Sequence, residues 1–207
     1  LLAEKYDITR EELDSFGLLS HQRATEATKN GFFKDEIVPL NIKLEDGTAD
    51  VHEIDEGIRF DASLENMQGL NPLREGGVIT AGTASQISDG AAAIMVANQH
   101  AVLKYNLPVR AKIHSLAVVG SDPVIMLEGP IPASEKVLEK AGLKIEDIDL
   151  YEVNEAFGSV PLAWAKALNA DQEKLNVNGG AQALGHPLGG TGAKLMTTLV
   201  NELERRS

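Results

Sequence analysis

Apolar side chains recur at helical spacing in several stretches of the chain, and residues that start or stop helices bound these stretches. Thr9-Arg10-Glu11-Glu12 is a capping box, and it opens an amphipathic helix that ends near Asn30-Gly31. The same reasoning predicts four further helices, over residues 63–68, from 131–134 to Gly142, over 154–168 and over 193–206.

Shorter apolar runs lie between these helices and predict strands, over residues 36–40, 91–97, 110–119, 145–153 and 175–178. Strands that alternate with helices are typical of layered α/β proteins. Residues 41–80 differ, because they combine charged side chains with many glycines and predict a loop-rich excursion. A domain boundary is expected near Thr80, where the composition changes to small residues.

Composition narrows the classes of protein that the chain could be. With 207 residues, 43% of them hydrophobic, it can bury a globular core. The formal net charge of −12 argues against a nucleic-acid partner, and no apolar run approaches the roughly 20 residues of a membrane helix. The lack of such a run predicts a soluble protein. The chain has no cysteine, which excludes disulfides and cysteine nucleophiles from these residues and favours a cytoplasmic compartment. The histidines lack metal-ligand spacing, so we expect no metal site.

Polar residues interrupt the apolar pattern at Asn154-Glu155, directly before a predicted helix. One interpretation makes Asn154 the N-cap of that helix, with Glu155 favoured by the helix dipole. The other makes Asn154 a neutral hydrogen-bond donor beside a developing oxyanion. The residues alone leave both interpretations open.

A glycine-rich loop from Gly179 to Gly192 contains the second candidate for chemistry. Such a density of glycine costs conformational entropy and suits a loop that lies close to a ligand. His186 stands before a proline in this loop, and an imidazole can act as a general base or as an oxyanion donor near neutral pH. A packed structural histidine is the alternative. The loop does not spell a phosphate-binding motif.

Three segments together resemble the signature blocks of the thiolase family. They are the small-residue run Thr80–Gly90, the tetrapeptide Asn154-Glu155-Ala156-Phe157 and the loop from Gly179 to Pro187. Their order is that of the family, and residues 33–39 and 129–133 are also similar, so the resemblance covers essentially the whole chain. It implies a thiolase-like layered α/β fold (α-β-α-β-α) with a loop-rich excursion domain, incomplete here.

The resemblance implies an acyl-CoA C-acyltransferase of fatty acid or lipid metabolism. Such an enzyme cleaves a 3-oxoacyl-CoA with coenzyme A or runs the reverse Claisen condensation. His186 would activate a cysteine thiol and help to hold the thioester oxygen, and Asn154 would anchor a water in the oxyanion hole. The residues that would contact coenzyme A are Ser85 at the pantetheine arm, Ala81 and Phe157 as wall residues, and Arg59 at the nucleotide.

The resemblance also sets expectations for partners. Acyl-CoA and CoA would be substrates, with no separate cofactor, and the protein would be a homodimer or homotetramer. Because CoA is a polyanion and the chain is acidic, a binding groove would have to gather Arg59, Lys43, Arg74 or their neighbours.

The family's two catalytic cysteines have no counterpart in this chain. We therefore expect a fragment that lacks an N-terminal part and the C-terminal Cys-x-Gly end, and that is inactive alone. On this alignment residues 1–86 are the latter part of the loop domain, 87–107 close the N-terminal half, and 108–207 belong to the C-terminal half.

Two other functions remain open. The chain could be a non-catalytic fragment that binds CoA or forms oligomers. It could also be a serine hydrolase in which His186 activates Ser85 or Ser159, although no Gly-x-Ser-x-Gly elbow is present.

Overall fold

Helix α2 (Arg10–Lys29) is the longest helix of the computed structural model, which describes residues 1–207. The Thr9 hydroxyl accepts a hydrogen bond from the Glu12 amide at 3.1 Å, and the Glu12 carboxylate accepts one from the Thr9 amide at 2.7 Å. After the helix, Gly31 has a φ of +71°, a value that glycine adopts without strain. The local sequence thus determines both ends of α2, as predicted.

The other predicted helices are present as well. Helix α5 (Pro130–Ala141) has Pro130 in its first turn and ends at the left-handed Gly142, and α3 (Leu64–Gln68), α6 (Ser159–Leu168) and α8 (Thr191–Arg206) follow the apolar pattern. The remaining short elements are α1 (Leu2–Lys5), α4 (Gln99–Tyr105), α7 (Ala181–Leu184), η1 (Ala81–Thr83), η2 (Ile145–Asp147) and η3 (Gln172–Lys174). None of the helices has both the length and the apolar character needed to cross a membrane.

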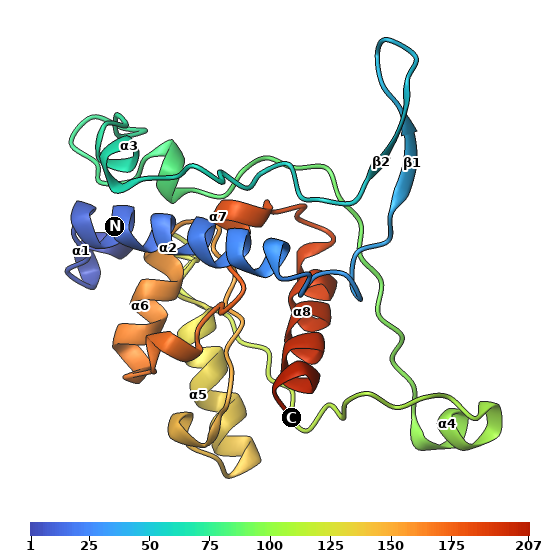
Figure 1. Ribbon diagram of the computed structural model, residues 1–207. Coiled ribbons are helices and arrows are strands. Elements are labelled where there is room, and N and C mark those ends of the chain that lie inside the picture. Colours follow the sequence, from blue (N-terminus) through green and yellow to red (C-terminus); the bar gives the residue numbers. More distant parts are fainter.

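Two apolar clusters hold the helices together. The larger cluster joins α1, α2 and α6 and includes Leu13, Tyr151 and Trp164. The rings of Tyr151 and Trp164 pack edge to face, with their centroids 5.1 Å apart. A smaller cluster joins the second half of α2 to α7, and its members are Ala24, Ala27, Phe33, Ile58, Ala183 and Leu184. Figure 1 shows α2 running across α6 and α7. The smaller cluster therefore places the start of the glycine-rich loop against α2.

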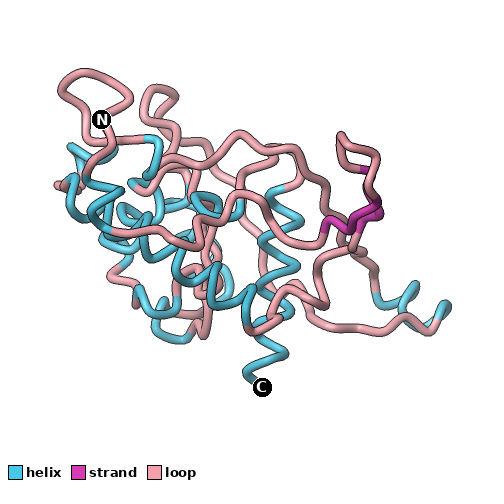
Figure 2. Tube along the Cα trace, turned by 45° about the horizontal axis from the view of Figure 1, so that its top comes forward, coloured by secondary structure: helices cyan, strands magenta, loops and turns pink.

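Most of the predicted strands are wrong. The single sheet is an antiparallel hairpin of β1 (Leu40–Lys43) and β2 (Ala49–His52), with Leu40 opposite His52. It projects from the rest of the molecule in Figure 1, and only its first residue overlaps the strand predicted over 36–40. Figure 2 shows that strands occur nowhere else.

Residues 91–97 and 110–119 form no strand, and none of these residues is buried. The side chains of Met95 and Val118 are 82% and 78% exposed. A strand is stable only when a neighbour satisfies its backbone N–H and C=O groups, and these two segments have no such neighbour within the chain. Their apolar pattern is real, but the pairing that would bury it is missing here.

The segments predicted as strands over 145–153 and 175–178 lie side by side without forming a sheet. Tyr151 and Leu175 form one parallel bridge, and the Tyr151 carbonyl accepts from the Asn176 amide at 2.9 Å. The side chain of Asn176 then replaces a strand neighbour, since it bonds both the amide and the carbonyl of Val153 at 2.8 Å. This pairing fixes the backbone directly before Asn154.

Candidate active site

The three segments that resemble family motifs meet in the structure. The backbone of Thr83 and Ser85 pairs with that of Gly158 and Ala156, with hydrogen bonds of 2.8 Å and 3.0 Å. The amide of His186 donates to the carbonyl of the next residue, Gln86, at 3.3 Å. The small-residue run thus lies between the Asn154 segment and the glycine-rich loop and contacts both.

Asn154 does not cap a helix. Helix α6 begins at Ser159 and its N-cap is Gly158, so the capping interpretation of Asn154 is wrong, as is the role of Glu155 in a helix dipole. The reason is that Val153 pairs with Asn176 and that Ala156 and Gly158 bond the backbone of Ser85 and Thr83, so the helix starts only at Ser159. Asn154 is half-buried, and its side chain is free to point elsewhere.

The amide of Asn154 faces the imidazole of His186. The Nδ2 atom of Asn154 lies 3.3 Å from the Nε2 atom of His186, although 32 residues separate them along the chain. Gly185, with a φ of +77°, makes the turn that presents the imidazole, and a side chain there would collide with Ser88. The Oδ1 atom of Asn154 is buried and has no hydrogen-bond partner within the chain.

The second nitrogen of the imidazole contacts Thr191, the first residue of α8. The distance between Nδ1 of His186 and Oγ1 of Thr191 is 2.6 Å, and Thr191 Oγ1 also donates to the Pro187 carbonyl at 3.0 Å. A hydroxyl has one proton, so the Thr191 oxygen that donates to Pro187 accepts from Nδ1. This network assigns the imidazole proton to Nδ1 and leaves Nε2 as the acceptor facing Asn154.

Glu155 joins three parts of the molecule beneath the site. Its fully buried carboxylate accepts hydrogen bonds from the Ser20 hydroxyl at 2.7 Å, the Asn176 amide group at 2.9 Å and the Gln182 backbone amide at 3.1 Å. Burial raises the pKa of Glu155, and these donors counteract part of that rise. The Ser20 hydroxyl in turn accepts from the amide of Gly180, where any side chain would overlap the carboxylate.

Further ionisable side chains lie close to the site. Lys194 donates to the Leu184 carbonyl at 2.7 Å, and burial lowers the pKa of its ammonium group. Burial raises the pKa of Glu152 well above its ordinary value, and the charge of Glu155 raises it further. Burial also raises the pKa of Glu36 to about 7. These carboxyl groups therefore titrate nearer to neutral pH than exposed ones.

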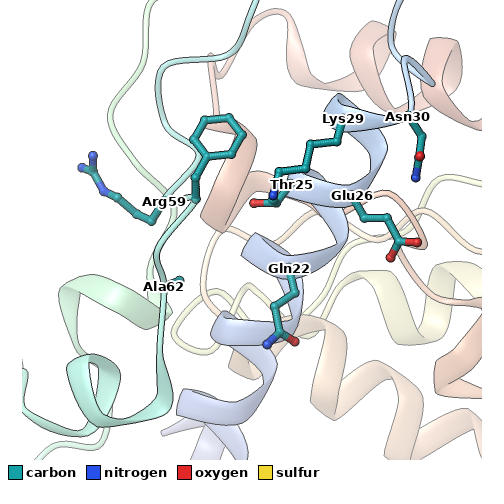
Figure 3. Close-up of a pocket in the computed structure, with 8 residues that line it drawn as sticks. Gln22, Thr25, Glu26, Lys29, Asn30, Arg59 and Ala62 are labelled. Atoms are coloured by element: carbon teal, nitrogen blue, oxygen red, sulfur yellow. The ribbon is translucent and has the colours of Figure 1, made fainter.

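A separate cavity of about 400 Å³ lies between α2 and the segment that contains Arg59 (Figure 3). Arg59 is exposed, and its side chain points away from α2. Lys43 and Arg74, which we expected to gather with Arg59, do not line this cavity. Its lining residues are Gln22, Thr25, Glu26, Lys29, Asn30, Arg59, Phe60 and Ala62.

The other predicted contact residues lie along the small-residue run. Ser85 is half-buried and pairs through its backbone with Ala156, while Phe157 is half-buried and forms a bridge with Ala84. Ala81 is exposed in η1. The geometry does not support the serine hydrolase, because the imidazole of His186 bonds Thr191 and Asn154 rather than Ser85 or Ser159.

Sequence reasoning missed two residues that the structure brings to His186. Thr191 was visible only as part of the glycine-rich loop, although its position five residues after His186 and at a helix start places it within reach. The contact of Gln86 with His186 was not predicted, because Gln86 lies in a run of small residues. Gln86 has the longest polar side chain between Thr80 and Gly90. No group of three or more His, Asp or Glu residues is arranged to hold a metal ion.

Two family models match the chain. The model described as the N-terminal domain of thiolase matches residues 1–100, and the model of the thiolase C-terminal domain matches residues 107–207. Among curated proteins, a steroid 3-ketoacyl-CoA thiolase of Mycobacterium tuberculosis is 52% identical over 205 residues, which are 99% of this chain and 49% of that protein. A 3-ketoacyl-CoA thiolase of Aliivibrio fischeri is 44% identical over 99% of this chain and 54% of that protein. The chain thus spans about half the length of the curated relatives it matches.

Solved structures give the same result. An acetyl-CoA acetyltransferase of Bacillus anthracis superposes with a TM-score of 0.94 at 44% identity, over 99% of this chain and 52% of that one. Human mitochondrial 3-ketoacyl-CoA thiolase in complex with CoA superposes with a TM-score of 0.91 at 43% identity, over 99% of this chain and 51% of that one. The expected thiolase-like α/β fold is therefore confirmed, because the backbone follows the thiolase path even where predicted strands do not pair.

Proposed function

The chain belongs to the thiolase family, and we propose that it supplies the histidine and the asparagine of an acyl-CoA C-acyltransferase active site. The reaction is the cleavage of a 3-oxoacyl-CoA by coenzyme A, or the reverse condensation. The observation that carries the proposal is the convergence of Asn154 and His186, which lie 3.3 Å apart and are held by separate loops. A serine hydrolase would need no such pair.

The proposed cleavage proceeds in two acyl transfers. A cysteine thiolate attacks the 3-keto carbon, the bond between the second and third carbons breaks, and acetyl-CoA leaves once its second carbon takes up a proton. The acyl group stays on the cysteine sulfur until the thiolate of a second CoA attacks it and restores the cysteine. Because this chain contains no cysteine, the attacking thiolate comes from residues outside it.

His186 has the proton arrangement that this chemistry needs. With its proton on Nδ1 and bonded to Thr191, the imidazole exposes Nε2, which can take the proton of a thiol. The resulting imidazolium carries a proton on Nε2 and can then donate to the oxygen of the tetrahedral intermediate. Asn154 adjoins the same nitrogen, and we assign it to anchor a water that donates to that oxygen. Its unpartnered Oδ1 supports a site completed by groups outside the chain.

We assign the contacts with CoA to the residues along the small-residue run and to Arg59. Ser85 lies between the Asn154 segment and the His186 loop, so a pantetheine arm beside it would lead to the reacting pair, with Ala81 and Phe157 as walls. An exposed guanidinium such as that of Arg59 can bind a CoA phosphate in a bidentate manner. CoA serves here as substrate, and the proposal requires no other cofactor.

The test compares the whole thiolase polypeptide that contains this sequence with the 207-residue chain alone, using acetoacetyl-CoA and CoA. We expect turnover by the whole polypeptide and none by the chain alone. In the whole polypeptide, His186→Ala and Asn154→Ala should each lower kcat by about 10²–10⁴ with little change in KM. Turnover by the chain alone would refute the claim that the attacking thiolate comes from residues outside it. Near-normal kcat in both variants would refute the assignment of His186 and Asn154 to the active site.

The chain alone remains a candidate CoA-binding fragment, and the exposed Arg59 beside a cavity of about 400 Å³ favours this. A rise in its melting temperature with CoA, lost in Arg59→Ala, would demonstrate binding without turnover. We also propose a homodimer or homotetramer in the cytoplasm, to be tested by light scattering and fractionation. Two relatives are described as peroxisomal and mitochondrial, from Petunia and human respectively.

A further inference from the structure

Gln86 places its side-chain amide between two backbone carbonyl groups from distant parts of the chain. Its Nε2 donates to the carbonyl of Gly57 at 2.7 Å and to that of Gln182 at 3.0 Å. Only a group with two donors can satisfy both carbonyls, so these partners fix the orientation of the amide. The backbone carbonyl of Gln86 also accepts from the amide of His186 at 3.3 Å. One residue therefore contacts two distant segments, one at Gly57 and one that runs from Gln182 to His186.

The first of these segments leads from Gly57 to Arg59 and is held on both sides of Gly57. Ile58 is buried in the smaller apolar cluster against Ala183 of α7. The amide of Arg59 donates to Nδ1 of His21 at 3.1 Å, and burial together with the Arg59 charge lowers the pKa of His21 to about 4. At neutral pH His21 is therefore uncharged and can accept this hydrogen bond.

The second segment is α7, which begins the turn towards His186. A Cβ atom at Gly57 would lie 2.6 Å from the carbonyl oxygen of Ala183 and 3.0 Å from the side-chain amide of Gln86. The backbone of the two segments is thus in direct contact, and Gln86 lies at the edge of that contact. Because α7 ends only two residues before His186, any change in its position moves the imidazole.

We propose that Gln86 is a positioning residue that sets the spacing between the Arg59 segment and the His186 loop, and so the orientation of the imidazole. The effect of Gln86 on kcat and KM rests on the proposed function, whereas its effect on the position of the His186 imidazole does not. Methionine has similar length and flexibility but offers no donor to the two carbonyls. Asparagine keeps the donor but is one methylene shorter, so it cannot reach both carbonyls from the same backbone position.

The structural test uses the isotope-labelled chain, with every variant measured at the same fixed pH. Gln86→Met and Gln86→Asn should each shift the imidazole ¹⁵N signals of His186 and speed exchange of its backbone amide hydrogen roughly tenfold or more. Gln99→Met is the matched control, because Gln99 is exposed on α4 and should leave both signals unchanged. Having two variants guards against one that fails to fold.

The kinetic test uses the whole polypeptide with acetoacetyl-CoA and CoA. Gln86→Met should lower kcat and raise KM for CoA together, since it disturbs both segments, whereas Gln99→Met should change neither. Unchanged His186 signals and amide exchange in folded Gln86→Met and Gln86→Asn would overturn the positioning role. A wild-type polypeptide without turnover would overturn the proposed function instead, and the spectroscopic result on the chain would still decide the role of Gln86.

Discussion

Removing the hydroxyl of Thr191 should disturb the proton arrangement of His186 without disturbing the fold. Thr191→Val keeps the shape of the side chain but leaves Nδ1–H of His186 without its acceptor at 2.6 Å. The opposite tautomer then becomes more populated, and in it Nε2 carries the proton and cannot accept another. We therefore expect a slower acyl transfer to cysteine with nearly unchanged substrate affinity.

The size of the effect follows from a single hydrogen bond. Such a bond contributes about 0.5–1.5 kcal/mol net, and about 1.4 kcal/mol corresponds to a tenfold change in an equilibrium. The population of the productive tautomer, and with it kcat, should fall roughly two- to tenfold. Thr191 is buried, so the same substitution should lower the melting temperature by about 2–4 °C for each kcal/mol lost.

Thr197→Val is the matched control. Its hydroxyl donates to the Ala193 carbonyl at 2.9 Å, the same bond to the residue four positions earlier that Thr191 makes with Pro187, but no histidine is involved. Nitrogen-15 NMR of the chain reports the tautomer of His186, and single-turnover acylation of the whole polypeptide reports the rate. If Thr191→Val and Thr197→Val give the same tautomer population and the same rate, Thr191 does not orient the imidazole.

Three further results are expected. Arg59→Ala should raise KM for CoA esters several-fold in steady-state assays and leave kcat nearly intact. Arg74→Ala should not raise KM, because Arg74 lies outside the cavity. A loss confined to kcat in Arg59→Ala would contradict the assignment of Arg59 to CoA binding. Glu155→Ala leaves the Ser20 hydroxyl and two amide donors buried without partners, so urea unfolding should show a loss on the order of 3–5 kcal/mol. Glu36 has an ordinary pKa of 4.5 and a folded pKa of about 7, so the folded state holds its proton more tightly and stability decreases as pH rises between these values. Glu36→Gln should remove this pH dependence of the unfolding free energy, which is on the order of 2 kcal/mol for a half-buried group. If the pH profile of unfolding is the same in Glu36→Gln, Glu36 is not its source.

The start of α2 and the end of α5 could be predicted because they depend on neighbours in sequence, whereas α6, predicted from residue 154, begins at Ser159. The Thr9–Glu12 capping box and the left-handed Gly142 act through contacts within four residues, and both determine helix ends in the structure. The strands failed for the opposite reason. Residues 91–97 and 110–119 have the right apolar pattern, but a strand needs a partner from elsewhere, and this chain provides none for them.

The candidate site shows the same division between local and distant information. The glycine-rich loop marked His186, because glycine density is a local signal of a shaped backbone. Thr191 reaches His186 through the local turn after Pro187, whereas nothing near Gln86 in sequence indicated its contact with His186, since that depends on how the small-residue run packs on the loop. The resemblance placed Asn154 and His186 in one reaction, and the distance between their side chains is a property of the fold alone.

The environment of Glu155 shows why a helix-start interpretation of the Asn154-Glu155 pair failed. A carboxylate at a helix start would be solvated and stabilised by the helix dipole, whereas Glu155 is fully buried and takes its donors from α2, from Asn176 and from α7. Those donors hold the carboxylate beneath the site, while the pairing of Val153 with Asn176 and of Ala156 with Ser85 keeps the backbone on either side of residue 155 out of a helix. The same carboxylate stabilises the junction of three segments directly beside Asn154, so substitution of Glu155 should alter the Asn154 to His186 geometry wherever the chain still folds.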